Sequence, residues 1–99
     1  MPGRLLNHAP IELKKGQNSG EARVTLNDKK IGMLHGVTKP GAEFDVVIKD
    51  LRGNEQARHH FKAANERFGK RIDLELPDDM YVIVAEEVKG ADKIDIFVE

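Results

Sequence analysis

Short segments in which apolar and polar residues alternate recur along this chain, separated by residues that favour turns. A period of two is typical of β-strands with one face in a core, because successive side chains point to opposite sides. The clearest cases lie in the last third, where 71–76 and 93–98 alternate and 80–88 is apolar at nearly every position. Three strands with compact connections are predicted there, and they favour a β fold for the whole chain.

The run from Tyr81 to Ala85 is apolar on both faces of its predicted strand. A strand at the surface of a sheet normally keeps one polar side, whereas this pattern is typical of a strand buried on both sides. We therefore expect a central strand. Its second cover is either the chain's own middle segment or another subunit.

Further alternating segments precede this region, at 11–15, 22–27, 31–33 and 43–49. With Asn27 and Asp28 as a two-residue turn, a hairpin would place Val24 opposite Ile31. A second hairpin, with its tip at 90–91, would place Ala85 and Ile83 opposite Ile96 and Val98. Both hairpins are predicted from the match of apolar positions across the turn.

The segment 54–68 supports two predictions. A helix would begin at Asn54 as N-cap, end at Gly69, and carry an apolar stripe of Ala57, Phe61, Ala64 and Phe68. A strand followed by a turn would place Ala57, His59, Phe61 and Ala63 on one face. The neighbouring strand signals favour the strand, and hence a small antiparallel β-sandwich, jelly-roll-like or immunoglobulin-like. The alternative is an α+β domain with one helix at 54–68 packed on an antiparallel sheet.

The 99 residues suffice for one domain, and we divide them into an extended N-terminal arm at 1–10 and a single sandwich domain at 11–99. The arm contains two prolines and a glycine, and its large apolar residues are Leu5 and Leu6. An ordered arm would lay these two leucines on a neighbouring subunit. Without cysteine, stability has to come from packing or self-association.

Sixteen basic and seventeen acidic residues give a formal net charge of −1, so no global positive field attracts nucleic acid. No stretch has the length of a signal peptide's apolar region or of a membrane span. The sequence predicts a soluble protein without membrane contact, and it leaves the cellular location open.

Basic residues nevertheless gather in the middle segment. The candidate basic patch comprises Arg58, His59, His60, Phe61, Lys62 and Arg67. On a sheet these residues could bind single-stranded nucleic acid, with Phe61 stacking on a base. We prefer to interpret them as an ordinary solvated face, because Glu55 and Glu66 dilute the charge. Carbohydrate is the other candidate ligand, although the chain has one tyrosine and no tryptophan to form a sugar platform.

We expect no metal site, cofactor or catalytic centre. His59 and His60 are adjacent, so on a strand they point to opposite faces and do not share one metal ion. The acidic residues do not match an EF-hand loop, and a calcium site from Asp50, Asn54 and Asp92 is a minority interpretation. The chain has one serine, Ser19, without a nucleophile-elbow pattern, and no glycine-rich phosphate loop.

The function predicted from these features is a non-enzymatic structural or interaction module, such as a small virion or assembly component. It would self-associate as a homo-oligomer, or dock on a protein partner, through a sheet face or edge. The expected interface residues are Leu5, Leu6, Tyr81, Ile83 and Phe97. The alternative is a ligand-binding domain for single-stranded nucleic acid or carbohydrate.

Overall fold

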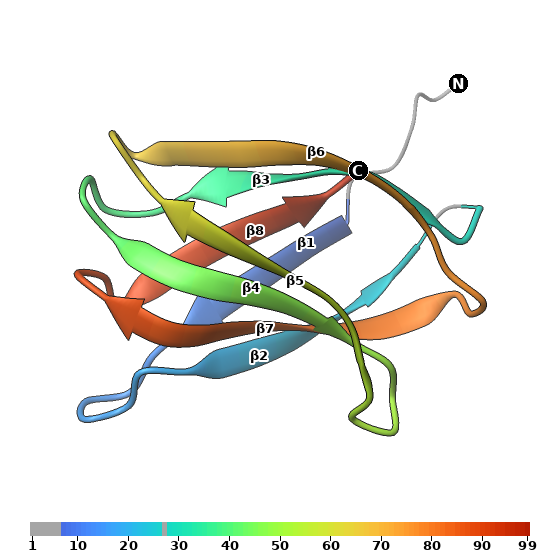
Figure 1. Ribbon diagram of the computed structural model, residues 1–99. Helices are drawn as coiled ribbons and strands as arrows, with labels where there is room; N and C mark the ends of the chain where they lie inside the picture. The colour runs from blue at the N-terminus through green and yellow to red at the C-terminus, as the bar shows by residue number, and fades with distance from the viewer. Residues whose placement is uncertain (1–6, 27) are drawn as a thin grey trace.

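The computed structural model describes residues 7–26 and 28–99, which form a two-layered β-sandwich (Figure 1). The strands of this part of the chain are β1 (Asn7–Glu12), β2 (Gly20–Thr25), β3 (Lys30–Val37), β4 (Glu43–Lys49), β5 (Glu55–Lys62), β6 (Arg67–Glu75), β7 (Met80–Lys89) and β8 (Lys93–Val98). Sheet A has the order β1-β8-β3-β6, and sheet B has the order β2-β7-β4-β5. All neighbouring strands are antiparallel, so the predicted antiparallel sandwich is confirmed.

The chain is folded in half at the turn between β4 and β5. From that turn outward, β4 pairs with β5, β3 with β6, β2 with β7 and β1 with β8. These four pairs lie alternately in sheet B and sheet A, and the contacts of β4 with β7 and of β3 with β8 complete the sheets. Eight antiparallel strands connected in this way form a jelly roll, one of the two sandwich types expected.

Local chemistry holds the turn at which the chain folds. The Asp50 carboxylate accepts hydrogen bonds from the backbone N–H groups of Arg52 at 2.9 Å and Asn54 at 2.8 Å. The bond from Asn54 is the main reason that the pKa of Asp50 lies below its ordinary value. Gly53 has a φ of 91°, a conformation that glycine adopts without strain. The turn residues are therefore matched to a sharp reversal.

Both predicted hairpins are wrong, although the strands themselves are present. Val24 on β2 lies opposite Tyr81 in sheet B, whereas Ile31 on β3 lies opposite Leu74 in sheet A. Positive φ angles at Asp28 and Lys29, 56° and 54°, turn the chain from one sheet to the other. The chain likewise crosses between sheets from β7 to β8, so Ala85 and Ile96 are not cross-strand partners. Two apolar residues at equal distances from a turn need not be cross-strand partners in one sheet. They can also lie in different sheets and both point into the core.

The helix alternative for 54–68 is wrong, because this segment forms β5 and the start of β6. Phe61 is buried, with its ring centroid 6.0 Å from that of Phe44 on β4 and 5.1 Å from that of Phe68 on β6. Phe44 and Phe68 meet edge to face at 5.0 Å. The three rings fill the sandwich where β5 and β6 connect the sheets. Burial of this cluster outweighs the local helix propensity.

The core lies between the two sheets and takes alternate residues from each strand. Tyr81, Ile83 and Ala85 on β7 have no exposed surface, and Val84, on the other side of the strand, is 7% exposed. The strand is central in sheet B, between β2 and β4. The inner face is fully covered, as predicted, whereas the outer face is covered at Val84 but Val82 is half-buried.

Strand β1 begins at Asn7 and pairs with β8, so residues 7–10 of the expected arm belong to sheet A. Leu5 and Leu6 lie outside the described residues. Within 7–26 and 28–99, no helix has the length and apolar character needed to cross a membrane.

Candidate functional site

The outer face of sheet A carries a row of stacked rings. Phe97 on β8 lies between His8 on β1 and His35 on β3 in the strand register. The ring centroids of His8 and Phe97 are 4.6 Å apart with planes at 11°, and those of His35 and Phe97 are 5.5 Å apart at 21°. Because the rings cover one another's faces, the row presents mainly ring edges to a partner.

We call this surface the Phe97 face. It lies on the outward side of sheet A and includes His8, Pro10, Met33, His35, Val37, Arg67, Gly69, Arg71, Asp95, Phe97 and Glu99. Met33 and Val37 flank His35 along β3, and they are 39% and 40% exposed. Met33, Val37 and Phe97, with the His35 ring among them, therefore form a mainly apolar strip along the middle of the face, which we call the apolar strip.

Three rows of residues cross the Phe97 face from β8 over β3 to β6. The rows are Asp95–Val37–Arg67, Phe97–His35–Gly69 and Glu99–Met33–Arg71. The third row is fixed on the β8 side by the Glu99 backbone N–H, which donates to the Met33 carbonyl at 3.0 Å. Each row thus has an acid or a ring on the β8 side and a cation or a glycine on β6.

The charges of the Phe97 face are separated. On the acidic side, Asp95 lies 2.9 Å from His8 Nε2 and Glu99 lies 3.2 Å from His35 Nε2. On the basic side, the Arg71 side chain is 82% exposed and lies 3.2 Å from Asp73. Within the part of the chain that the structure describes, the Arg67 side chain has no ion-pair partner. Across these three rows the face is therefore acidic or aromatic on β8 and basic or open on β6, with the mainly apolar residues of β3 between them. Lys93, on the same side of β8, lies beyond these rows opposite Glu12 of β1.

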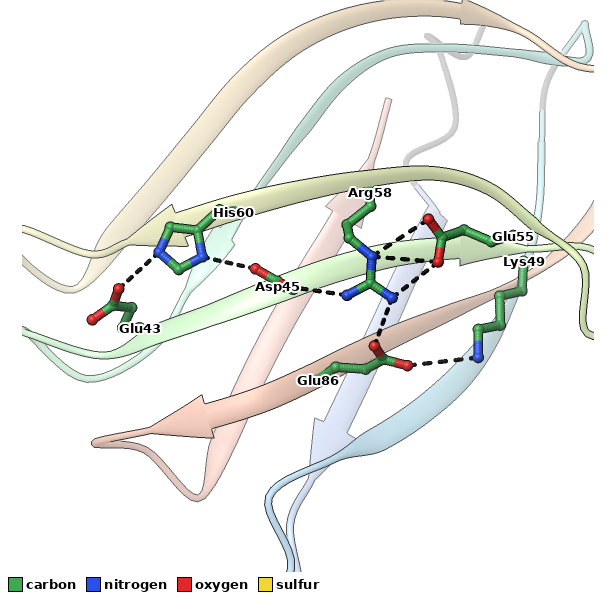
Figure 2. A network of polar contacts seen from close by, with 7 residues as sticks. All are labelled: Glu43, Asp45, Lys49, Glu55, Arg58, His60 and Glu86. Carbon is green, nitrogen blue, oxygen red and sulfur yellow. Dashed lines mark hydrogen bonds and ion pairs between the residues drawn. The ribbon is translucent and has the colours of Figure 1, made fainter.

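The outer face of sheet B, which we call the Arg58 face, has the opposite character (Figure 2). Its members include Arg23, Glu43, Asp45, Val47, Lys49, Glu55, Arg58, His60, Val84 and Glu86. The Arg58 guanidinium donates to Asp45 at 3.0 Å, to Glu55 at 2.9 Å and to Glu86 at 2.9 Å. One cation thus joins carboxylates from three strands.

His60 extends the same network. Its Nδ1 lies 2.7 Å from Asp45 and its Nε2 lies 2.8 Å from Glu43. These contacts, first with Asp45 and then with Glu43, raise the pKa of His60 above its ordinary value. Both ring nitrogens face carboxylates, an arrangement that favours the protonated ring and joins His60 to the ion-pair network.

Apolar residues lie beneath this network. Val47 on β4 has no exposed surface, and its cross-strand neighbours on the same face are Arg58 and Val84. Arg58 and Lys49 have long aliphatic stems that can cover apolar neighbours while their charged ends stay in water. On the outer side of β7, Val84 lies in the register between Val47 of β4 and Glu21 of β2, so its cover there comes from neighbours within sheet B and not from a second layer.

A polar hollow of about 420 Å³ lies beside His60. It is lined by Asn18, Glu43, Phe44, Asp45, His60, Glu87 and Lys89. Glu87 has a φ of 52° at an irregularity in the pairing of β7 with β4. Among the described residues, no group of three or more His, Asp or Glu side chains is placed to hold a metal ion.

The candidate basic patch is not brought together on one surface. Arg58, His60 and Lys62 point outward from sheet B, whereas Phe61 is buried and His59 is half-buried on the inner side of β5. Arg67 lies on the Phe97 face of sheet A. Burial, and secondarily the charge of Lys70, lowers the pKa of His59 below its ordinary value. Strand alternation separates these neighbours, and three carboxylates neutralise Arg58.

Of the expected interface residues, Phe97 lies on an outer face, whereas Tyr81 and Ile83 are in the core and present no surface to a partner. The exposed residues Met33 and Val37 were not among the interface residues predicted from the sequence. Alternation predicted that Met33 shares a face with Ile31, but a register shift between the two residues sends Met33 outward. A glycine within the strand, Gly32, is the sequence signal that could have indicated this irregularity.

The residues considered for a calcium site are also separated. Asp50 is engaged with Asn54 and Arg52 in the turn after β4, whereas Asp92 forms an ion pair with Lys39 at 3.4 Å, near the start of β4. They thus lie at opposite ends of the strand.

No protein-family model matches this chain, and no curated protein matches its sequence. A search of solved structures finds a similarity to TmCBM61, whose structure was determined in complex with β-1,4-galactotriose. The TM-score is 0.47 and the sequence identity is 17%. The alignment covers 92% of this chain and 66% of that one, so this chain spans slightly less than two thirds of its neighbour's length.

Proposed function

We infer that this protein is a non-catalytic interaction module that binds another protein surface with its Phe97 face. The observation that carries this proposal is the apolar strip formed by Met33, Val37 and Phe97. Met33 and Val37 are about 40% exposed on the outer surface of sheet A, and charged residues border the strip. A contiguous apolar area with a polar border is the usual composition of a protein-binding surface.

The contrast with the other outer face supports the same proposal. On the Arg58 face, buried Val47 lies among charged side chains that are paired with one another. On the Phe97 face, Val37 keeps 40% of its surface in water although it is flanked by Arg67 in the register. The two outer faces therefore differ: Val47 is buried on the Arg58 face, whereas Val37 stays exposed on the Phe97 face.

The alternative ligands gain no comparable support. Phe61, which would stack on a base, is buried, and Arg58 is shared among three carboxylates. A sugar platform needs an exposed ring face, but Tyr81 and Phe44 lie in the core and Phe97 is stacked between two histidines. Jelly rolls occur in viral capsids and in lectins, so the fold alone does not choose a function.

Site-specific photo-cross-linking tests the proposal. A benzophenone amino acid is placed at Val37, or at Arg23 as a control, because Arg23 is exposed on the outer face of sheet B. In cells that express the protein, we expect a discrete protein adduct from position 37 and none from position 23. Equal adducts from the two positions, no adduct, or capture of only glycan or nucleic acid at position 37 would contradict the proposal.

The captured protein is then identified by mass spectrometry, purified and titrated with three forms of the chain. We expect Val37→Glu to raise the Kd about tenfold or more, because it places a charge in the apolar strip. Arg23→Glu should leave the Kd within about twofold of wild type, since distant surface charges contribute little.

A further inference from the structure

We propose that the partner of the Phe97 face is a second copy of this chain, related to the first by a two-fold axis that runs along β3. This inference rests on the proposed function and specifies its partner. It follows from the order of side chains across the face, which is complementary to itself under that symmetry.

The symmetry fixes which residues meet. A two-fold axis above β3 and parallel to it leaves each residue row at the same height but exchanges β8 with β6. Because β8 and β6 are the neighbours of β3 in sheet A, each at the usual strand spacing of about 4.8 Å, the exchange superimposes them. Residues of β3 therefore face their own copies, and residues of β8 face β6 of the other molecule.

The two outer rows then form ion pairs. Asp95 lies opposite Arg67 of the second copy, and Glu99 lies opposite Arg71. Arg67, which has no ion-pair partner among the described residues, gains one. Asp95 contacts His8 through Oδ1 and keeps Oδ2 for a second donor. Each pair occurs twice, so four charge pairs of opposite sign border the interface.

The middle row places an aromatic ring opposite a glycine. Phe97 lies opposite Gly69 of the second copy, which has no side chain of its own and is bordered by His35 Cβ and Met33 Cε. The edge of the Phe97 ring therefore meets no β6 side chain of the other molecule in this row. Val37, His35 and Met33 meet their own copies at the axis, which covers the apolar strip on both molecules.

The other two-fold arrangement of the same faces has its axis across the strands. It would place β6 over β6 and β8 over β8, so that arginine faces arginine and acid faces acid. Like charges at an interface oppose association. The charge order of the Phe97 face therefore selects the axis along β3.

Charge reversal tests both the dimer and its axis. Size-exclusion chromatography with light scattering should give wild type a mass of twice 11.1 kDa at high concentration. Arg67→Glu and Asp95→Arg, each alone, should weaken the dimer about tenfold or more, because each reverses two ion pairs. An equal mixture of the two variants should regain dimers, since only the mixed dimer has opposite charges in both pairs. Arg23→Glu is the matched control and should dimerise as wild type does.

Circular dichroism confirms that each variant is folded, and the pair Arg71→Glu and Glu99→Arg provides the same test in the third row. A monomer at every concentration would overturn this inference while leaving the binding of a different protein intact. A dimer insensitive to Arg67→Glu and Arg71→Glu, or single variants that stay monomeric when mixed, would overturn the axis and with it the proposal. A partner captured at position 37 that is not this chain would support the proposed function alone.

Discussion

The two outer faces of the sandwich differ in how they satisfy their side chains. On the Arg58 face, cations and acids from three strands are paired with one another above the buried Val47. On the Phe97 face, acids and cations lie on opposite sides of an apolar strip, and Val37 remains 40% exposed. On a face where charged side chains form ion pairs with one another, few groups are left for a partner to bind. On a face where acids and cations are separated, a partner with the opposite order of charges can pair with them.

Replacing one valine on each face by alanine is expected to give the largest difference in the free energy of unfolding. Val47→Ala should lower the free energy of unfolding by about 2 kcal/mol, because it removes fully buried methyl groups. Val37→Ala should cost about 0.5 kcal/mol or less, as is usual at an exposed site. Urea denaturation at a concentration where the protein is monomeric measures both. Similar losses at the two positions would mean that the faces are not differently covered.

A smaller effect is expected when one arginine on each face is replaced by methionine, which keeps an apolar stem. Arg58→Met should lower the Tm at low salt, because three carboxylates lose their shared cation. Arg67→Met should leave the monomer's Tm unchanged, because Arg67 has no ion pair with any residue of 7–26 or 28–99.

The Arg58→Met deficit should shrink at high salt, where charges are screened. It should also shrink as the pH falls. His60 and Arg58 hold the pKa of Asp45 below 3.8, and Arg58 holds that of Glu55 below 4.5, so their stabilisation is present above these values and lost as the pH falls through the folded-state pKa. If the loss of Tm caused by Arg58→Met did not change with salt or pH, the loss would come from side-chain packing and not from charge.

The smallest expected effect is a difference in pKa between the adjacent residues His59 and His60. NMR titration should place the pKa of His60 above 6.5, because Asp45 and Glu43 stabilise its charged form, and that of His59 below 6.5, because burial disfavours charge. His60 thus stabilises the fold below pH 6.5 and loses this effect as the pH rises through its folded-state pKa. His60→Gln should therefore destabilise more at about pH 5.5 than at about pH 9. Coincident titration of the two rings would contradict their placement on opposite sides of β5.

Strands could be predicted from the sequence because alternation is a local property. The segments at 43–49 and 94–98 show it clearly, and Phe97 lies on the side opposite Ile96, as the pattern requires. Strand partners could not be predicted in this way. Val24 pairs with Tyr81 because the chain folds in half at 50–54, and nothing near Val24 records that distant turn.

The residues of the candidate site could not be predicted for the same reason, because their neighbours come from strands that are distant in the sequence. The register places Arg58 beside Asp45 and Glu86, which are far away in sequence, so a local count of basic residues overstated its charge. The shift after Ile31 moved Met33 to the outer face; Gly32 is the one local sign of an irregularity, and the pairing with β6 shows which way Met33 points. Tyr81 was expected at an interface because its run is apolar on both sides, and the sequence could not tell which side the chain covers itself.

The folded-in-half connection also sets an order in which the strands can assemble. The β4–β5 pair needs only the short turn at Asp50, whereas Asn7 and Val98 meet across nearly the whole chain. Loop-closure entropy makes such distant contacts slow to form, so pairing is expected to proceed outward from that turn. Because β8 lies between β1 and β3, sheet A stays divided until β8 has left the ribosome. A nascent chain halted before Lys93 would expose both unpaired edges, which are the segments a chaperone would have to protect.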